Sequence, residues 1–325
     1  MLGWGTCQGD MARRRAGAGL VGFPDFVSAV KELPLPGGGR TAERFLRLAE
    51  LGRQDPVLAR LAEGHADAIA ILAELGVGID DGQRAQPWGV WAAVPASVTA
   101  TPADGAWRLD GDRPWCSGAA ACAFALVTAK APDGIRLFAV DLARAGATPL
   151  DGTWPAVGMA RSDSRTVRFA AAAATPVGRP GEYTDRPGFW HGGIGVAACW
   201  FGGAVGVSDA LTTAALDRDL DPHALAHLGA VDARLAAARA LLLDAAARID
   251  AAPDRVDERL ARQVRAVVEA TATEVIDRVG RALGAAPLCR DAGHAARVAD
   301  LTVYLRQSHA ERDLQLLGSL AAAAR

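Results

Sequence analysis

The stretch DGAWRLDGDRPWCSG, residues 104–118, decides how the middle of this chain is interpreted. Residues Trp107–Asp110 predict a short strand, and a second strand follows that ends around Trp115 and Ser117. The Asp-Gly pair completed by Gly111 predicts a tight turn between them, because glycine adopts positive φ angles at little cost. Such a hairpin presents an indole, a hydroxyl and a glycine backbone together at a strand end. That combination suits a planar heteroaromatic ligand, although an ordinary hairpin with a tryptophan in its core has the same pattern.

The apolar pattern divides the rest of the chain into helical, β and helical parts. Residues 41–76 carry apolar stripes at three-to-four spacing, which predict two helices. From Pro87 to Phe169 the period changes to two and turn residues separate seven short strands, which predicts a β-barrel or sandwich. Beyond Gly181 the pattern is helical again, and four long apolar stripes predict an antiparallel four-helix bundle. These stripes are Ile194–Leu216, Ala224–Ile249, Val256–Leu283 and Ala295–Leu320.

We therefore expect an α+β multidomain protein with an N-terminal helical domain, a central β-barrel and a C-terminal four-helix bundle. The expected boundaries are residues 1–83, 84–180 and 181–325. Residues 1–22 contain three consecutive arginines followed mainly by alanine and glycine, which is too weakly apolar for a signal peptide. We expect these residues to be poorly ordered.

Composition argues against nucleic acid and membrane partners. The chain of 325 residues has a formal net charge of -2, so it has no general attraction for nucleic acid or acidic membranes. Half of its residues are hydrophobic, yet no charge-free apolar run reaches transmembrane length. The most apolar segment, Ile194–Val207, is short and rich in glycine, which favours a buried helix.

The five cysteines are scattered along the chain and lie in no C-x-x-C or Cys/His cluster. This spacing indicates neither a metal site nor a disulfide framework. A reducing cytoplasm is the simplest location for such a protein.

Two segments resemble the acyl-CoA dehydrogenase family. LDGDRPWCSGA, residues 109–119, resembles the family signature LNG-x-K-x-W-I-[TS]-N-[GA]. Residues 156–169, AVGMARSDSRTVRF, resemble the family segment lGmrgsdt..v.F. The order of helical, β and helical parts is also that of the family, and the resemblance covers residues 36–320.

The resemblance implies an FAD cofactor bound between the β-domain and the bundle, in a homodimer or homotetramer. Trp115 would flank the flavin ring and Ser117 would hydrogen-bond its polar edge, with Gly118 leaving the backbone uncovered. The segment Val90–Ser97 keeps only the proline of the family's T-E-P-x-x-G-S-D motif, so a flavin-contacting hydroxyl is missing. A backbone amide, with Ala93 as the candidate, would replace it.

The resemblance also points to residues for the FAD phosphates and for the polar groups of the ligand. Arg281 and Gly284 lie in a segment similar to the family's q-x-x-G-G turn, where the chain approaches the adenine diphosphate. The family's Arg-x-x-Phe-Gly motif is not evident, and Arg218 is the nearest arginine to its place. Ser162 and Ser164 are further candidates for ligand contacts, although serines in surface turns are ordinary.

The family's catalytic carboxylate is absent from both of its usual places. Aligning Asp300 with the family's Arg-Asp pair puts Ser308 at the base position, with His309 beside it. The other family position, near the start of the first bundle helix, offers His191 but no acid. His309 would act as a base or as a hydrogen-bond donor to the flavin, since imidazole titrates near neutrality. Flavin monooxygenases of this fold use a histidine in this region.

Other side chains stay open as contributors. Glu311 and Asp313 follow His309 and could supply a carboxylate, although a helix of this composition normally exposes them to solvent. His65 lies on an apolar helical stripe, where a buried structural histidine is the simpler interpretation and a contact with flavin or substrate the alternative.

Three functions are compatible with the sequence. The first is an FAD-dependent oxidoreductase acting on the CH–CH group of an acyl thioester or a related small molecule, with an electron-transfer partner possible. The second is a flavin-dependent monooxygenase of the same fold that uses His309. The third is a redox-inactive binding or assembly subunit that kept the fold, because the Thr-Glu-Pro, base and phosphate-arginine motifs all depart from the family.

Overall fold

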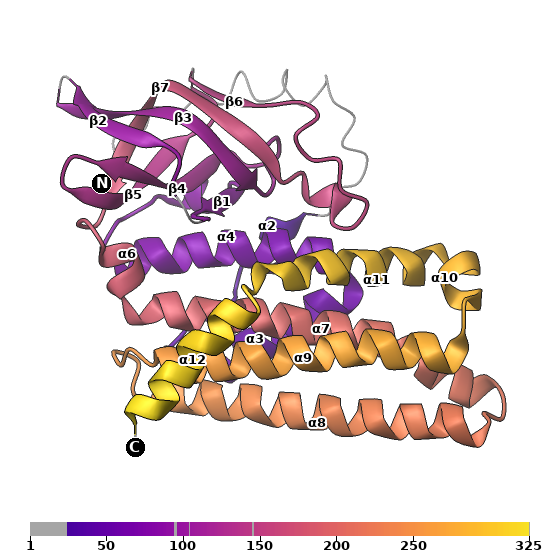
Figure 1. The fold of residues 1–325 in the computed structure, drawn as a ribbon. Coiled ribbons are helices and arrows are strands. Elements are labelled where there is room, and N and C mark those ends of the chain that lie inside the picture. Colours follow the sequence, from indigo (N-terminus) through magenta and orange to yellow (C-terminus); the bar gives the residue numbers. More distant parts are fainter. Residues whose placement is uncertain (1–24, 94–95, 104, 145, 325) are drawn as a thin grey trace. The chain divides into compact units, whose positions relative to one another are not determined.

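The computed structural model describes residues 25–93, 96–103, 105–144 and 146–324 (Figure 1). The chain forms two compact units. The β unit contains residues up to Glu32 together with Gly64–Pro155 and Ala160–Arg186, and the helical unit contains Leu33–Glu63, Ala156–Met159 and Pro187–Arg325. The three-domain division stays a prediction, and the expectation about residues 1–22 lies outside the described residues.

A small closed barrel forms most of the β unit. Its strands are β1 (Trp88–Trp91), β2 (Thr99–Ala103), β3 (Ala106–Cys116), β4 (Phe124–Ala131), β5 (Gly134–Asp141), β6 (Ala147–Pro149) and β7 (Arg165–Val177). Strands pair in the ring β4–β2–β3–β7–β5–β4, and β6 adds to β7. Strands β1 and β2 both pair with β4 in parallel, at successive positions along it. Of the two predicted architectures, the structure shows the barrel.

The predicted turn at Asp110-Gly111 is wrong, because β3 continues through it as one bent strand. The pairing of β3 with β7 shifts register between Leu109 and Gly111, which marks a β-bulge. Gly111 has φ +119, and a Cβ there would lie 3.0 Å from the carbonyl oxygen of Ser97. The Asp110 carboxylate accepts a hydrogen bond from the amide of Ala171 on β7. The Asp-Gly pair therefore bends a strand instead of reversing it.

The barrel buries apolar residues on its inside and part of its outside. Its interior core includes Trp91, Leu109 and Phe138. Outside, the half of α4 (Pro56–Glu74) that follows Gly64 packs on the barrel wall, with Ile71 and Leu72 in the same core cluster as Trp88 and Leu126. Short helices complete the unit: α2 (Phe26–Ala29), α5 (Asp81–Arg84), η1 (Ala160–Ser162) and α6 (Glu182–Asp185). Strand β4 is thus buried on both faces, as its continuous burial shows.

Long helices that lie side by side form the helical unit (Figure 1). They are α3 (Thr41–Gln54), α7 (Pro187–Asp217), α8 (Pro222–Ala251) and α9 (Glu258–Leu283), followed by α10 (Ala286–Arg290), α11 (Ala292–Tyr304), η2 (Leu305–Gln307) and α12 (Glu311–Ala323). Helix α7 packs on α3, α8 and α9. The predicted fourth stripe, Ala295–Leu320, is not one helix, because the chain leaves helical geometry at Ser308 and Ala310.

Two glycines bring α3 and α7 into backbone contact. A Cβ on Gly52 would lie 2.2 Å from the carbonyl oxygen of Cys199, and a Cβ on Gly202 would lie 1.8 Å from that of Ala49. Only glycine permits this approach. Among the described helices, α7 alone has the length and apolar composition of a membrane span, which corrects the expectation that no charge-free apolar run is that long; 78% of its most apolar window is buried. Packing against α3 and α9 accounts for that composition.

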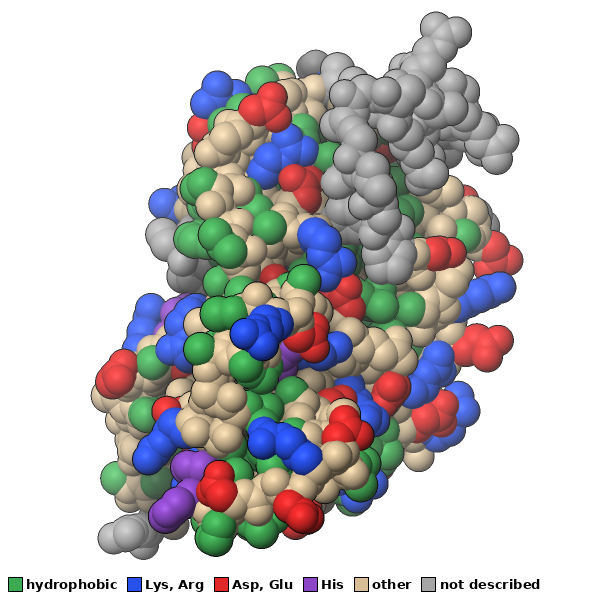
Figure 2. Space-filling view, turned by 90° about the vertical axis from the view of Figure 1, so that its right-hand side faces the viewer, with side chains coloured by type: hydrophobic (Ala, Val, Ile, Leu, Met, Phe, Trp, Pro, Cys, Tyr) green, Lys and Arg blue, Asp and Glu red, His purple; other side chains and the backbone are tan. Residues whose placement is uncertain are grey.

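Acidic and basic side chains are intermixed on the face shown in Figure 2, without a broad region of one sign. This distribution fits the nearly balanced total of 35 Lys and Arg against 37 Asp and Glu.

Candidate functional site

Trp115 is held out of the barrel by a strained backbone. It has φ +65, which is costly for a bulky residue, and the register of β3 against β7 is irregular between Arg113 and Cys116. The neighbouring Cys116 is buried, whereas Trp115 is 61% exposed. A β-bulge that turns a large aromatic side chain to the surface is typical of a binding site.

A second indole lies beside it. The ring of Trp154 meets that of Trp115 edge to face, with centroids 5.9 Å apart. This contact packs a second indole against Trp115, which stays 61% exposed.

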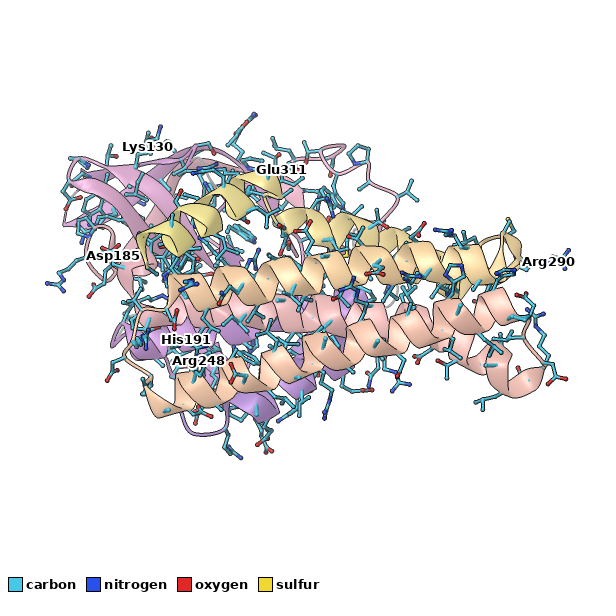
Figure 3. The ribbon with its side chains drawn as sticks, turned by 60° about the horizontal axis from the view of Figure 1, so that its bottom comes forward. Lys130, Asp185, His191, Arg248, Arg290 and Glu311 are labelled. Carbon is cyan, nitrogen blue, oxygen red and sulfur yellow. The ribbon has the colours of Figure 1, made fainter. Side chains whose placement is uncertain are left out.

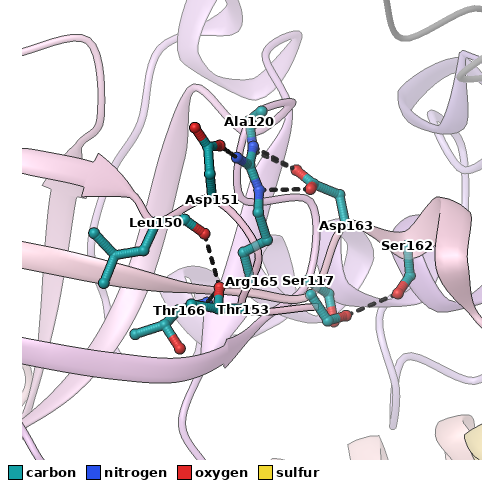
Figure 4. Close-up of polar contacts among 10 residues, drawn as sticks. Ser117, Ala120, Leu150, Asp151, Thr153, Ser162, Asp163, Arg165 and Thr166 are labelled. Carbon is teal, nitrogen blue, oxygen red and sulfur yellow. Dashed lines mark hydrogen bonds and ion pairs between the residues drawn. The ribbon is translucent and has the colours of Figure 1, made fainter. Parts of the chain in front are cut away.

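Ser117 begins a chain of three buried hydroxyls. Its Oγ lies 2.9 Å from Oγ of Ser164, which in turn lies 2.8 Å from Oγ of Ser162 (Figure 4). The three hydroxyls form a buried polar cluster, and their contact with a ligand stays a prediction.

Gly118 follows at φ +68 and is buried. Its amide donates to the carbonyl of Ser162 at 2.7 Å, and the amide of Ala120 donates to the carboxylate of Asp163. Arg165 holds that carboxylate in an ion pair (Figure 4). The loop after β3 is therefore fixed on the loop before β7, and the amide of Gly118 is already used within the protein, so a contact of Gly118 with a cofactor stays a prediction.

Arg113 links this region to the residues that follow β1, a role that sequence reasoning missed. Its guanidinium is fully buried and donates through Nη2 to the carbonyl of Ala93 at 2.7 Å and to Oγ1 of Thr128 at 2.9 Å. Burial lowers the pKa of Arg113. Ala93 itself is exposed, so its carbonyl is anchored while the rest of the residue faces outward.

In the helical unit, the turn between η2 and α12 carries Ser308 and His309. The side chain of His309 is 60% exposed. The Asp313 carboxylate accepts the His309 amide at 3.0 Å and lies 3.8 Å from Nδ1 of the imidazole. Oγ of Ser308 accepts the amide of Ala310 at 3.2 Å, so Ser308 shapes the turn.

Asp313 is kept ionised by its surroundings. Burial acts to raise the pKa of its carboxyl, but the His309 amide and the charges of His309, Arg265 and Arg262 outweigh it and hold that pKa below the ordinary value. Arg262 donates to Asp313 at 2.9 Å. An ionised aspartate against the δ nitrogen is a common way to orient an imidazole.

His191 and Glu311 lie apart along the chain but in the same unit (Figure 3). His191 is buried near the start of α7. Glu311 is exposed on the first turn of α12. Arg265 on α9 connects these regions, since it donates to Gly193 on α7 and to Gln307 before α12. The two places where the resemblance puts a base are thus joined through one arginine.

Arg281 and Gly284 lie at the other end of α9. From Arg265 to Arg281 the helix rises by roughly 24 Å. Arg281 is exposed and pairs with Asp277 at 3.6 Å, while Gly284 ends the helix with φ +68. They do not join the His309 turn, and Arg218, just beyond α7, is equally exposed.

His65 has a structural role. It is 4% exposed, and its Nδ1 accepts the amide of Trp88 at 3.3 Å. Burial, with a smaller effect from the charge of Arg84, lowers the pKa of His65 to about 4. It is a neutral hydrogen-bond acceptor in the β unit.

No protein-family model and no curated protein matches this chain. Solved structures do match it. FMN-bound TdsC, a dibenzothiophene monooxygenase from Paenibacillus sp. A11-2, superposes with a TM-score of 0.77 at 21% identity and covers 97% of this chain and 90% of that chain. Methanesulfinate monooxygenase MsuC from Pseudomonas fluorescens gives 0.75 at 18% identity, covering 92% and 89%. KijD3 in complex with FMN and an amino-sugar nucleotide gives 0.74 at 20% identity, covering 97% and 91%.

At 18–21% sequence identity, the structural similarity establishes the fold alone. The chain has the fold of these flavin-binding structures, in agreement with the acyl-CoA dehydrogenase-like architecture that its sequence predicts. It shows mixed helices and sheet with a small barrel.

Proposed function

We propose that this protein is a flavin-dependent monooxygenase. The observation that carries the proposal is the chemistry of the His309 turn: Ser308 stands where a dehydrogenase has its carboxylate, and the acid that is present, Asp313, is bonded to His309 and Arg262. A carboxylate tied to an arginine is a poor base for removing a carbon-bound proton. An imidazole beside a carboxylate can give or take a proton through the ring nitrogen that the carboxylate does not face.

The solved structures of the same fold support the same choice. Those named as TdsC and MsuC are monooxygenases, and TdsC has been seen with FMN and indole together. Each covers at least 89% of this chain.

The residues of the β unit fit a flavin. Trp115 offers an exposed indole for stacking on a planar ring, and Ser117 brings a hydroxyl of the buried Ser117–Ser164–Ser162 cluster close to it in sequence. When bound, reduced flavin supplies the electrons that activate molecular oxygen. The chain's own contribution is to hold the ring between an aromatic face and a hydroxyl, and to keep its loop fixed through Asp163 and Arg165.

On the helical unit we assign proton handling to His309. Asp313 fixes the backbone of the turn and favours a proton on Nδ1, which leaves Nε2 as the atom that accepts or donates. His191 is buried near the start of α7. We assign it a structural role and no part in proton transfer.

The identity of the flavin and the assembly belong to the proposal as well. The resemblance implies FAD, whereas TdsC and KijD3 have been solved with FMN. Contact of Arg281 and Gly284 with an adenine diphosphate, in a homodimer or homotetramer, would favour FAD. Binding both flavins to wild type and Arg281→Ala tests this, because the variant should lose affinity for FAD and keep its affinity for FMN.

The experiment begins with flavin binding by fluorescence and absorbance. Bound flavin is photoreduced without oxygen, then mixed with 18O2 and indole, dibenzothiophene or methanesulfinate. We expect oxygen consumption and 18O in at least one product. Oxidation of an acyl-CoA thioester without oxygen, with loss of flavin colour, would contradict the proposal in favour of a dehydrogenase. If the protein binds neither FAD nor FMN, the remaining function is that of a redox-inactive binding or assembly subunit.

A further inference from the structure

Two arginines on one face of α9 lie beside the His309 turn. Arg262 and Arg265 are three residues apart, so they project from neighbouring positions of the helix. Arg262 donates to Asp313 at 2.9 Å, and Asp313 accepts the amide of His309. Arg265 donates through Nη2 to the carbonyl of Gln307 at 3.3 Å. Both sides of the turn, residues 307–310, are therefore tied to the same helix.

Arg265 is itself held rigidly. Its guanidinium lies 4.6 Å from the ring centroid of Trp200, which is fully buried. Its Nη1 donates to the carbonyl of Gly193 at 2.9 Å. A planar guanidinium that stacks on an indole and donates to two carbonyls has little rotational freedom left. It can therefore fix the position of Gln307 relative to the first turns of α7.

The turn needs such support because its backbone is strained. Ala310 has φ 45 and ψ -115, which lies outside the usual regions for a residue with a Cβ. A conformation of this kind persists only where surrounding contacts impose it. The Ser308 hydroxyl, which accepts the Ala310 amide, lies inside the turn and cannot by itself anchor the turn to the rest of the unit.

We propose that Arg265 is a positioning residue for His309: seated on Trp200, it fixes the 307–310 turn against α7 and so sets where the imidazole is held. The catalytic meaning of this role rests on the proposed function. The geometric role does not, and the two are tested separately.

The first test measures amide hydrogen exchange by mass spectrometry in wild type, Arg265→Lys and Arg265→Met. Lysine keeps the charge but cannot donate from a planar fork to two carbonyls. Exchange in peptides covering residues 307–313 should rise about tenfold in both variants, which corresponds to the loss of one charged hydrogen bond. Exchange across α8 should stay unchanged.

Arg278→Lys is the matched control, since Arg278 lies on the same helix and pairs with Glu274 away from the turn. It should leave residues 307–313 as in wild type. Equal exchange of the turn in wild type and both Arg265 variants would overturn the proposal. So would an equal rise throughout the helical unit, which would mean a general loss of stability.

The second test uses indole, reduced FMN and oxygen. If Arg265 positions His309, Arg265→Lys should lower kcat about tenfold and leave KM for indole within about twofold. It should also release more hydrogen peroxide per oxygen consumed. Unchanged kcat and peroxide release, in a variant whose turn exchanges faster, would show that the turn does not serve catalysis. If wild type does not oxygenate any probe, the proposed function fails while the exchange result still decides the geometry.

Discussion

The carboxylate of Asp313 lies 3.0 Å from the amide nitrogen of His309 and 3.8 Å from Nδ1 of the same residue. One side chain thus restrains both the backbone and the ring of the histidine. Asp313→Asn retains an acceptor for the amide but loses the charge that favours a proton on Nδ1. We expect kcat for oxygenation to fall about tenfold, the usual effect of losing a charge-assisted hydrogen bond, with flavin affinity unchanged.

The ionised Asp313 carboxylate also predicts how the stability of the protein changes with pH. The pKa of Asp313 is lowered from 3.8 in the folded protein, so its ionised form favours folding. That contribution is complete above pH 3.8 and is lost as pH falls through the lowered value. The stability difference between wild type and Asp313→Asn should therefore be constant at neutral pH and shrink in acid. Chemical denaturation at several pH values measures it, and a constant difference down to the acid limit would contradict it.

His309→Ala should abolish oxygenation without unfolding the protein. The imidazole is 60% exposed, so its removal leaves no buried cavity. Product formation from indole should fall to background, with the melting temperature within about 2 °C of wild type. His223→Ala, at an exposed histidine beside the start of α8, is the control and should behave as wild type. Wild-type turnover in His309→Ala would remove the residue from the mechanism.

Trp115→Ala should weaken flavin binding. Loss of a stacked indole corresponds to roughly 1–2 kcal/mol, or a rise of the dissociation constant by about five- to thirtyfold. Because Trp115 is 61% exposed and has a positive φ, the protein should remain folded. Flavin fluorescence titration gives the constant. Leu216→Ala, at an exposed position on α7, is the control, and equal affinities in all three proteins would place the flavin elsewhere.

His65 should make the protein less stable in mild acid. Its pKa falls from 6.5 to about 4 on folding, so the unfolded chain takes up the proton first. Stability should decline as pH falls below 6.5 and level off near 4, by about 3 kcal/mol in total. His65→Asn keeps an acceptor for the Trp88 amide and cannot titrate, so its decline should be smaller by that amount. Parallel pH profiles of the two proteins would contradict the assignment.

Gly202→Ala should be among the most damaging single substitutions in the helical unit. The new methyl group would overlap the carbonyl oxygen of Ala49, and neither backbone can move away without disturbing α3 or α7. We expect a loss of about 3 kcal/mol or more. Gly229→Ala on α8 meets nothing within 4 Å and should stabilise the protein by about 0.5–1 kcal/mol. Equal melting temperatures for the two variants would contradict the close packing.

The local sequence predicts helices and strands better than the turns, bulges and breaks that connect them. Strand β5 (Gly134–Asp141) lies in the region where alternation predicts short strands, because alternation of apolar residues follows directly from burial of one strand face. Asp110-Gly111 satisfies the chemistry of a turn and of a bulge equally, and only pairing with β7 decides between them. The break at Ser308 was missed for a similar reason: its neighbours favour a helix, while bonds from α9 impose the turn.

The residues of the candidate site stay predictions. The motif indicates Trp115 and Ser117, and the alignment indicates His309, since each stands in a recognisable segment. Arg265 belongs to no motif, and Arg113 stands at the basic position of the LNG-x-K-x-W signature, which does not reveal what it contacts. Their partners are backbone carbonyls far away in sequence, which leave no pattern of complementary residues to detect.

The crossing of α3 and α7 limits how the helical unit can respond to a ligand. With no side chain between Gly202 and Ala49, the two helices have no room to slide or roll over one another, and they must move as a single stiff body. Helix α12 differs, since none of its described residues is buried. If a ligand binds beside the His309 turn, we therefore expect the resulting backbone movement in α12. Helices α3 and α7 should keep their positions relative to one another.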